Sequence, residues 1–402
     1  MSRASARPGA GSVGVVRTQH LDLPDPLRLD SGATLAPVRI AYETYGTLAP
    51  RRDNAVLVCH ALSGDAHAAG WSDDPSAPTT VDGAGAGVRG RGGLGWWDGM
   101  IGPGKAFDTD RYFVICTNLI GSCRGSTGPG SIDPETGRPY GRTFPVVTVG
   151  DMVRAQAAFL DALGIRTLVA ASGGSLGGMQ ALEWAVQLPD RIRGIVPIAA
   201  TAALGTQGVA WNAIARSAIM ADPDWQDGAY AGTGRAPRAG IKVARMLGHM
   251  TYLSEQAVRD RFGRDFQDGA GPVYDLSKAD FAIESYLRYQ ADSFADRFDA
   301  NAYLYISRAL TYFDLARSYG DGSLARALAP VEAATLLLSF SSDWLYPPRD
   351  SEDIARALRA NGKDVQHVVI DADYGHDSFL LEEARMTEHI TAFLDRVAER
   401  VA

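Results

Sequence analysis

The sequence predicts an α/β fold in which helices cover both faces of a mostly parallel sheet. Apolar runs typical of buried strands, such as residues 54–59, 111–118 and 167–171, alternate with helical patterns such as residues 150–163. Strands that alternate with helices of this length usually form parallel sheets with both faces covered. The chain has 402 residues and 46% apolar composition, which suffices for a large buried core.

The alternation of strands and helices stops in the second half of the chain. Residues 206–320 show helical and aromatic patterns without clear strands, and strand patterns return near residue 332. We therefore expect a helical lid at 206–320, inserted into a core made of residues 14–205 and 321–402. Residues 1–13 are expected to form a loose tail. A lid over a nucleophile can keep water from an acyl-enzyme, which favours transfer over hydrolysis.

A run rich in Gly, Ala, Ser and Pro lies between residues 70 and 95. It contains Gly85, Gly87 and Gly90 at the spacing of a dinucleotide-binding fingerprint. No strand pattern precedes this spacing and no helical pattern follows it, so the cofactor interpretation is rejected. We interpret the run as a surface insertion whose role the sequence does not specify.

Composition narrows the classes of partner. The net charge is −8 and no basic cluster appears, which argues against a nucleic-acid partner. No apolar run approaches the length of a membrane span, and the first residues lack the apolar segment of a secretory signal. Cys59, Cys116 and Cys123 form neither a disulfide framework nor a zinc-binding spacing. These features predict a cytoplasmic protein with reduced thiols, no bound metal and no membrane partner.

The most informative motif lies at residues 173–177, which read G-x-S-x-G with Ser175 at the centre. An apolar strand pattern precedes it and a helical pattern at 179–186 follows, which is the context of a nucleophile elbow. Glycines on both sides of the serine let strand and helix approach closely. The turn would present Ser175 at the carboxyl end of the strand, close to the positive end of the helix. An ordinary turn is the alternative.

A base and an acid follow this serine in the chain order of α/β-hydrolase folds. A strand pattern at 334–340 ends just before Asp343, and another at 365–370 is followed by a loop that contains His376. Because catalytic groups collect at the carboxyl edge of an open α/β sheet, both side chains should approach Ser175. The expected architecture is thus an α/β-hydrolase fold with an inserted lid.

Other acids and histidines compete for these roles. Asp371 and Asp373 lie near His376 in the sequence, and Asp377 is its neighbour, but Asp377 would have to fold back to hold the imidazole. Asp343 is therefore the preferred acid. The chain has seven histidines, and six of them are less suitable than His376. His367 lies within a strand pattern, and the loop after an early strand contains His60 and His67. Outside the strand-end pattern lie His20, His249 and His389.

Acyl transfer also needs two fixed donors for the negative oxygen that forms in the transition state. The strand at 54–59 is followed by a loop at 60–65. We expect the backbone N–H of Leu62 in this loop and that of Leu176, directly after the nucleophile, to form the oxyanion hole. A simple strand-to-helix turn is the alternative for this loop.

The motifs together resemble those of the homoserine O-acetyltransferase family of methionine biosynthesis, over residues 35 to 395. Ser122 stands where the family usually has glycine, Leu176 where methionine is common, and residues 76–93 look like an extra insertion. The matching segments are residues 60–65, 96–105, 121–129, 173–180, 244–247, 297–301, 342–348 and 374–380.

The resemblance implies transfer of an acetyl group from acetyl-CoA to the hydroxyl of L-homoserine. It implies a ping-pong reaction through an acyl-serine on a homodimer, with no bound cofactor. The family pattern assigns Ser175, Asp343 and His376 to the triad, and Arg245 and Asp377 to the amino-acid substrate. A guanidinium can grip a carboxylate and a carboxylate can hold an ammonium group. The alternatives are a helix-surface arginine for Arg245, and a solvated loop acid or a helix cap for Asp377.

The same pattern includes members that use succinyl-CoA or that acylate L-serine. No lysine or arginine is adjacent to Leu62 or Ser175, which favours acetyl, because a succinyl carboxylate in a partly dry site needs a cation. Folding could still deliver Arg124 or an arginine of the lid. A serine hydrolase is a second candidate. A non-enzymatic binding module would normally have lost a triad residue, and none is lost.

Overall fold

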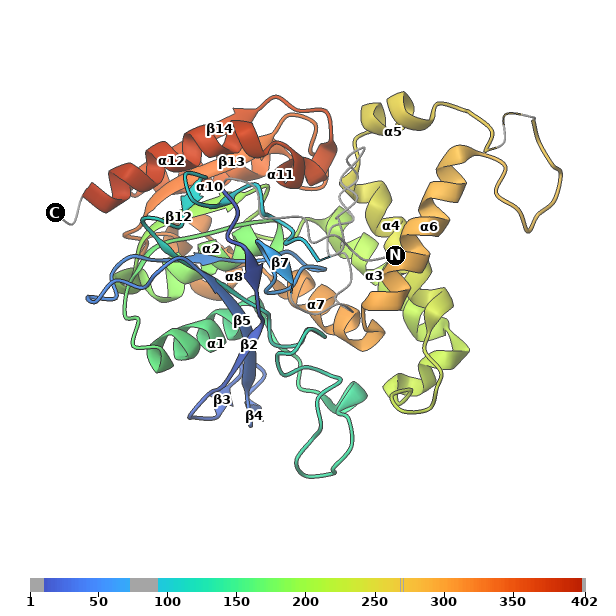
Figure 1. Cartoon of the computed structure of the whole chain (residues 1–402), viewed down its shortest axis with the longest axis horizontal. Helices are drawn as coiled ribbons and strands as arrows, with labels where there is room; N and C mark the ends of the chain where they lie inside the picture. Colours follow the sequence, from blue (N-terminus) through green and yellow to red (C-terminus); the bar gives the residue numbers. More distant parts are fainter. Residues whose placement is uncertain (1–10, 73–92, 268, 270, 400–402) are drawn as a thin grey trace.

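The computed structural model describes residues 11–72, 93–267, 269 and 271–399 (Figure 1). A central sheet of eight strands consists of β2 (Gln19–Asp22), β5 (Arg39–Tyr45), β6 (Ala55–Val58), β10 (Phe113–Thr117), β11 (Leu168–Gly174), β12 (Ile192–Ile198), β13 (Ala334–Phe340) and β14 (Val365–Ile370). Their order across the sheet is β14-β13-β12-β11-β6-β10-β5-β2. All pairs from β14 to β10 are parallel, whereas β5 pairs antiparallel with both β10 and β2. The predicted mostly parallel sheet is confirmed.

Six shorter strands form three separate two-stranded ladders. These pairs are β1 (Val15–Val16) with β7 (Trp71–Ser72), β3 (Leu27–Arg28) with β4 (Thr34–Leu35), and β8 (Ile101–Gly102) with β9 (Phe107–Asp108). Short 3-10 helices occupy Gly141–Thr143 (η1), Pro189–Arg191 (η2), Pro223–Gly228 (η3) and Gly375–Asp377 (η4).

Helices cover both faces of the central sheet (Figure 1). On one face, Leu57 belongs to the same apolar cluster as α1 (Val149–Ala162) and α2 (Leu176–Gln187). Its neighbour Val56 points to the opposite face and belongs to the cluster of α12 (Glu383–Glu399). Every residue of β6, β11 and β13 is buried, which explains why these strands read as continuous apolar runs.

Local sequence signals explain where two of the core helices begin. Thr148 caps α1: its side chain accepts a hydrogen bond from the N–H of Asp151 at 3.1 Å, and the Asp151 carboxylate accepts from the N–H of Thr148 at 2.9 Å. The helix α10 (Pro348–Ala360) begins at the second of two prolines. Proline suits this first position because the N–H that it lacks would have no partner within the helix.

Between β12 and β13 the described residues form seven α-helices, and we call the first six the lid helices. They are α3 (Thr206–Ala221), α4 (Arg238–Tyr252), α5 (Glu255–Phe262), α6 (Ala282–Arg297), α7 (Ala300–Tyr312) and α8 (Leu315–Tyr319), and the short α9 (Leu324–Ala327) precedes β13. α3 packs on α4 and α7, and α4 packs on α6. In Figure 1, α3, α4, α5 and α6 lie to the right of the sheet, whereas α8 lies beside α2. The lid helices occupy the segment predicted as a lid, although the division into two units stays a prediction.

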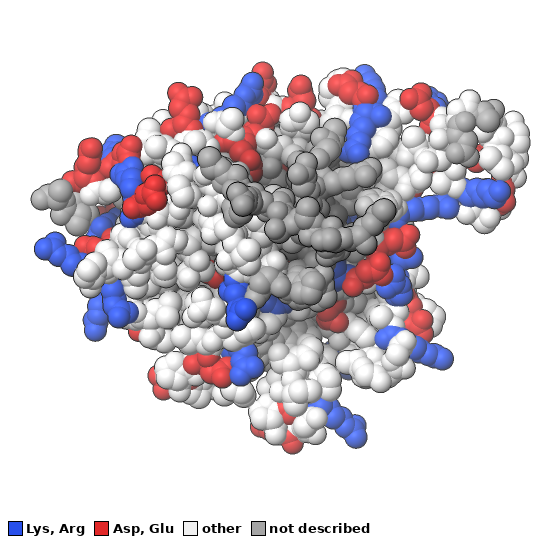
Figure 2. Space-filling model, viewed as in Figure 1, with Lys and Arg blue, Asp and Glu red and all other residues white. Residues whose placement is uncertain are grey.

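Two sequence interpretations fall outside the described residues. They concern residues 1–10 of the expected tail and the run with Gly85, Gly87 and Gly90. Within the described residues, no helix has the length and apolar character needed to cross a membrane. Acidic and basic side chains are interspersed over the face in view in Figure 2.

Candidate active site

Ser175 lies in the sharp turn between β11 and α2. Its backbone has φ 59° and ψ −123°, a conformation that non-glycine residues rarely adopt and that marks a strained turn. A Cβ on Gly173 or Gly177 would lie 2.2 Å or 2.1 Å from the carbonyl oxygen of Cys59. Both positions therefore need glycine, because β6 passes directly beside the turn. This is the geometry of a nucleophile elbow.

The structure brings His376 and Asp343 together from the ends of two neighbouring strands. His376 Nδ1 lies 2.8 Å from Asp343 Oδ2, and both residues are 2% exposed. The other carboxylate oxygen accepts hydrogen bonds from the N–H groups of Leu345 and Tyr346, each at 3.0 Å. The carboxylate is thus held in place by the backbone and directs Nδ1–H toward itself. This leaves Nε2 of His376, which has no hydrogen-bond partner in the described part of the chain, to exchange protons.

The competing carboxylates lie elsewhere. Asp371 is exposed, and its Oδ1 accepts a hydrogen bond from Ser341 Oγ at 2.7 Å. Asp373 is also exposed. Asp377 is buried and lines a cavity next to Ser175.

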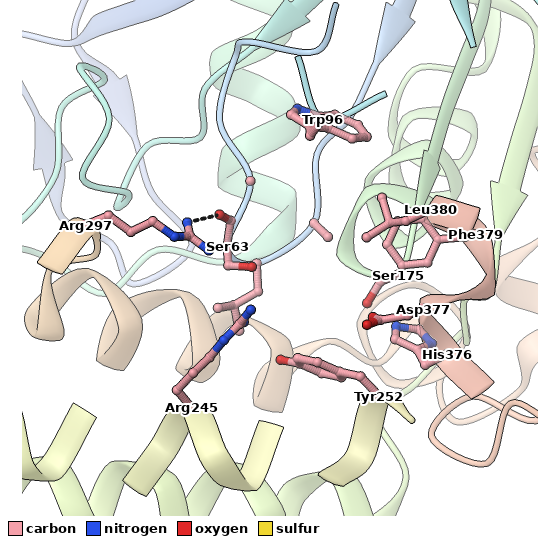
Figure 3. A pocket seen from close by; sticks show the side chains of 13 residues that line it. Ser63, Trp96, Ser175, Arg245, Tyr252, Arg297, His376, Asp377, Phe379 and Leu380 are labelled. Atoms are coloured by element: carbon pink, nitrogen blue, oxygen red, sulfur yellow. Dashed lines mark hydrogen bonds between the residues drawn. The ribbon is translucent and has the colours of Figure 1, made fainter. Parts of the chain in front are cut away.

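This cavity joins groups from the sheet edge and from the lid helices (Figure 3). Ser175 and His376 line it from the core, as do apolar side chains that include Trp96 and Phe379. Arg245 and Tyr252 of α4 line it from the lid side. The proposed nucleophile therefore opens onto a site with both apolar and charged walls.

Arg245 and Asp377 place opposite charges in this cavity. Both are buried, at 5% and 6% exposure, so the alternatives of a surface arginine and a solvated acid are wrong. The guanidinium of Arg245 lies over the ring of Phe294, 4.6 Å from its centroid, and 5.9 Å from that of Tyr252. Burial raises the pKa of Tyr252, while Arg245 lowers it and Asp377 raises it. Both charges thus act on one side chain of the cavity wall.

The loop after β6 carries the expected oxyanion donor Leu62, which also lines the cavity. His60 ties this loop to the core: its Nδ1 lies 2.7 Å from Ala61 O, and its Nε2 accepts from the N–H of Leu119 at 3.2 Å. Burial lowers the pKa of His60, which favours the neutral imidazole needed for this pair of contacts. The second expected donor, Leu176, is the first residue of α2 and is fully buried.

Sequence reasoning gave no role to two polar residues of the cavity wall. Tyr252 lies on the same face of α4 as Arg245, two helical turns further on, which is a signal that could have found it. Arg297 stood within a recognised motif without a role, yet it lines the cavity. Arg124, considered as a cation for a succinyl group, instead has its Nε 4.0 Å from a carboxylate oxygen of Asp65.

A second cavity begins at Ser175 and extends between the lid helices and the core. It shares Leu62 and Tyr252 with the first cavity, and its wall is mainly apolar and aromatic, with Trp211 and Tyr303 among its members. None of its lining residues is charged.

Within the described ranges, no cluster of three or more His, Cys, Asp or Glu side chains could hold a metal ion.

The sheet and the elbow define a protein of the α/β-hydrolase fold, and the comparisons agree. Residues 54–383 match the family model of the alpha/beta hydrolase fold. The structure of homoserine O-acetyltransferase from Bacillus anthracis superimposes with a TM-score of 0.84 at 30% identity, covering 94% of this chain and 98% of that one. Esterase E22 gives a TM-score of 0.82 at 30% identity, over 94% of this chain and 100% of its own. The predicted α/β-hydrolase fold is confirmed.

Sequence relatives narrow the class to one family. This chain is 50% identical to homoserine O-acetyltransferase of Solidesulfovibrio magneticus, over 97% of this chain and 95% of that protein. It is 50% identical to that of Rhodospirillum rubrum, over 93% and 91%. It is also 49% identical to homoserine O-succinyltransferase of Burkholderia cenocepacia, over 97% and 99%. The chain belongs to the homoserine O-acetyltransferase family, as its motifs predicted.

Proposed function

We propose that this chain transfers an acetyl group from acetyl-CoA to the hydroxyl of L-homoserine in a ping-pong reaction of L-methionine biosynthesis. The observation that carries the proposal is the single cavity in which Ser175 and His376 meet the opposite charges of Arg245 and Asp377. The names of the relatives agree with this activity. Acetyl-CoA acts as a cosubstrate, and the reaction as proposed needs no bound cofactor.

In the first half-reaction, His376 Nε2 takes the proton of Ser175 Oγ, which attacks the thioester carbonyl carbon. The N–H groups of Leu62 and Leu176 hold the negative oxygen that forms. The carbon–sulfur bond then breaks, and the CoA thiolate leaves with the proton from His376. Asp343 stabilises the imidazolium between these steps. The product is an acetyl ester on Ser175.

In the second half-reaction, His376 takes the proton of the homoserine hydroxyl, whose oxygen attacks the acetyl carbon. Ser175 leaves as the alcohol, with the proton returned by His376, and the acetyl ester of homoserine forms. Arg245 binds the carboxylate of the amino acid and Asp377 binds its ammonium group. The charge pair therefore selects a zwitterionic acceptor over water or a simple alcohol.

The two cavities differ in the acyl group that their walls would suit. The second cavity, which begins at Ser175, has no charged side chain in its wall and so suits a small uncharged acyl group. Arg297 in the first cavity is the feature that would suit succinyl. A serine hydrolase is the second candidate, because esterase E22 shares the fold at 30% identity.

The test measures kcat/KM of the purified protein with acetyl-CoA or succinyl-CoA, each combined with L-homoserine, L-serine or water. Acetyl-CoA with L-homoserine should be preferred, and Ser175→Ala serves as the inactive control. A roughly tenfold preference for succinyl-CoA or for L-serine would overturn the substrate assignment and leave the triad intact. Thioester cleavage that homoserine does not accelerate would identify a hydrolase.

A homodimer and a cytoplasmic location stay predictions from the family resemblance and the composition. Sedimentation equilibrium of the purified protein measures the first, and fractionation of its native cells measures the second. A monomer at micromolar concentration would contradict the predicted dimer.

A further inference from the structure

We propose that Arg297 is a positioning residue of the oxyanion hole, which holds the turn at residues 61–64 so that the N–H of Leu62 faces the reacting carbonyl. This inference rests on acyl transfer at Ser175, and it gives Arg297 a role separate from that of Arg245. The two arginines share the cavity wall and both lie over the ring of Phe294, but Arg297 also donates a hydrogen bond to the loop after β6.

The contact that carries the inference joins the lid to the loop after β6. Arg297 Nη1 donates a hydrogen bond to the carbonyl oxygen of Ser63 at 3.4 Å (Figure 3). Ser63 directly follows Leu62 in a tight turn, which the N–H of Gly64 closes on the carbonyl of Ala61 at 3.1 Å. Peptide groups in such a turn are coupled through few free dihedrals. A bond that fixes the Ser63 carbonyl therefore also restricts the direction of the Leu62 N–H.

The guanidinium is itself held in position. It lies over the ring of Phe294, 5.2 Å from the centroid, and this ring is completely buried. Arg245 stacks on the same ring at 4.6 Å. One buried aromatic side chain thus supports two cations, of which one is assigned to the acceptor and the other contacts the loop of the oxyanion hole.

The chain after Arg297 anchors the corner between α6 and α7 to the core. The N–H of Asp299 donates to Cys123 Sγ at 3.5 Å, and Asp299 Oδ1 accepts from the N–H of Ala302 at 2.8 Å, which caps α7. Arg297 therefore projects from a fixed corner of the lid toward the sheet edge. Its positive charge near the oxyanion hole would also favour the developing negative oxygen.

The test uses a substrate with neither CoA nor an amino acid. p-Nitrophenyl acetate acylates Ser175 and releases p-nitrophenolate, so its rate reports on the triad and the oxyanion hole without the sites for CoA and the amino acid. For Arg297→Gln we expect the rates of three steps to fall by a similar factor, about 10- to 100-fold: acylation by p-nitrophenyl acetate, acylation by acetyl-CoA, and deacylation by L-homoserine. Loss of a direct oxyanion donor costs about 10²–10³ in kcat.

Two further variants make the result specific. Arg297→Lys keeps the charge but not the planar fork of donors, so each of the three rates should recover in part. Arg264→Gln removes an exposed lid arginine that stacks on Phe281 at 5.2 Å, and all three rates should stay at the wild-type level. Circular dichroism on heating shows whether each variant is folded.

A selective loss would overturn the inference. If only the step with L-homoserine or only the step with a CoA ester is slowed, Arg297 binds that substrate and does not position the loop. The inference would also be overturned if Arg297→Lys and Arg297→Gln both fold and show wild-type rates for all three steps. If Arg297→Gln does not fold, wild-type rates in Arg297→Lys would overturn it. Failure of the proposed function is distinguishable, because the wild-type protein would then not transfer acetyl to homoserine. The rates of acylation by p-nitrophenyl acetate in the wild type and in the variants would still test the role of Arg297.

Discussion

The sheet edge and the lid helices contribute different chemistry to one cavity. The core supplies Ser175, Asp343 and His376, each placed after the end of a strand of the central sheet. The lid helices supply cations, Arg245 and Arg297, placed by the packing of α4 and α6. The comparison teaches that the triad comes from the sheet edge alone, whereas the proposed acceptor site joins a cation of the lid to Asp377 of the core.

The two regions also differ in what they bury. The core strands β6, β11 and β13 bury mainly apolar side chains, with Ser172, Thr335 and Ser339 as the polar exceptions. The lid helices bury charged and polar groups, among them Arg245 and His249, the latter fully inaccessible. Burial of such groups is costly unless they are paired or used, so these lid residues, like the buried Asp343, His376 and Asp377 of the core, carry the signs of a binding surface.

The largest expected effect is on the core nucleophile. Ser175→Ala should reduce transfer by about 10⁵- to 10⁶-fold, because triad members act as a unit. It should also abolish the acetyl adduct, which in the wild type adds one acetyl mass to the peptide containing Ser175 after brief mixing with acetyl-CoA. The exposed Ser318→Ala is the control. Near-normal turnover in Ser175→Ala would exclude the covalent mechanism.

The acid of the core should come second. Asp343→Asn removes the charge that orients His376 and should lower kcat by about 10⁴-fold, by analogy with other triads. The exposed Asp371→Asn and Asp373→Asn should change kcat less than about threefold. Stopped-flow rates of both half-reactions measure this. A large loss of kcat in Asp373→Asn together with near-wild-type kcat in Asp343→Asn would show that the acid is misassigned.

Removing the lid cation Arg245 should separate the half-reactions. Arg245→Ala should raise KM for L-homoserine by about 10- to 100-fold, the cost of one charged hydrogen-bonded contact, because only the second half-reaction uses the amino acid. Acylation by acetyl-CoA should change far less. Single-turnover acylation compared with steady-state kinetics measures the difference. Equal losses in both steps would place Arg245 in the CoA site or in the scaffold.

The smallest expected effect concerns the stability of the lid. Burial, together with the nearby charges of Arg245, Arg297 and Arg261, lowers the pKa of His249 well below its usual value. The unfolded chain binds this proton near pH 6.5 and the folded chain does not. The contribution of His249 to the free energy of unfolding is therefore complete above about pH 6.5. It decreases as the pH falls below that value, by at most about 2 kcal/mol at pH 5.

His249→Leu should remove this part of the pH dependence and leave stability at pH 7 nearly unchanged. Denaturant unfolding at pH 7 and pH 5 measures it, with exposed His20→Gln as the control. If the free energy of unfolding of His249→Leu depends on pH as in the wild type, the pKa of His249 is not lowered in the folded state.

Much of the fold was predictable because its signals are local. The strands at 334–340 and 365–370 were predicted with the bounds that the structure shows, since both read as short runs rich in apolar residues, although only the first is fully buried. The elbow at Ser175 was predictable because its glycines are required by one close approach of backbone. The short ladders near the amino end carry too few residues for such a signal.

The sequence by itself determined the order of the elements, the elbow and the strand ends at which Ser175, Asp343 and His376 lie, because each follows from periodicity and turn chemistry within a few residues. Only the tertiary structure decided which distant groups meet. The 2.8 Å contact of His376 with Asp343, the entry of Tyr252 into the cavity and the contact of Arg297 with Ser63 depend on how strands register and helices pack. Such contacts join residues far apart in the chain, so no local pattern encodes them.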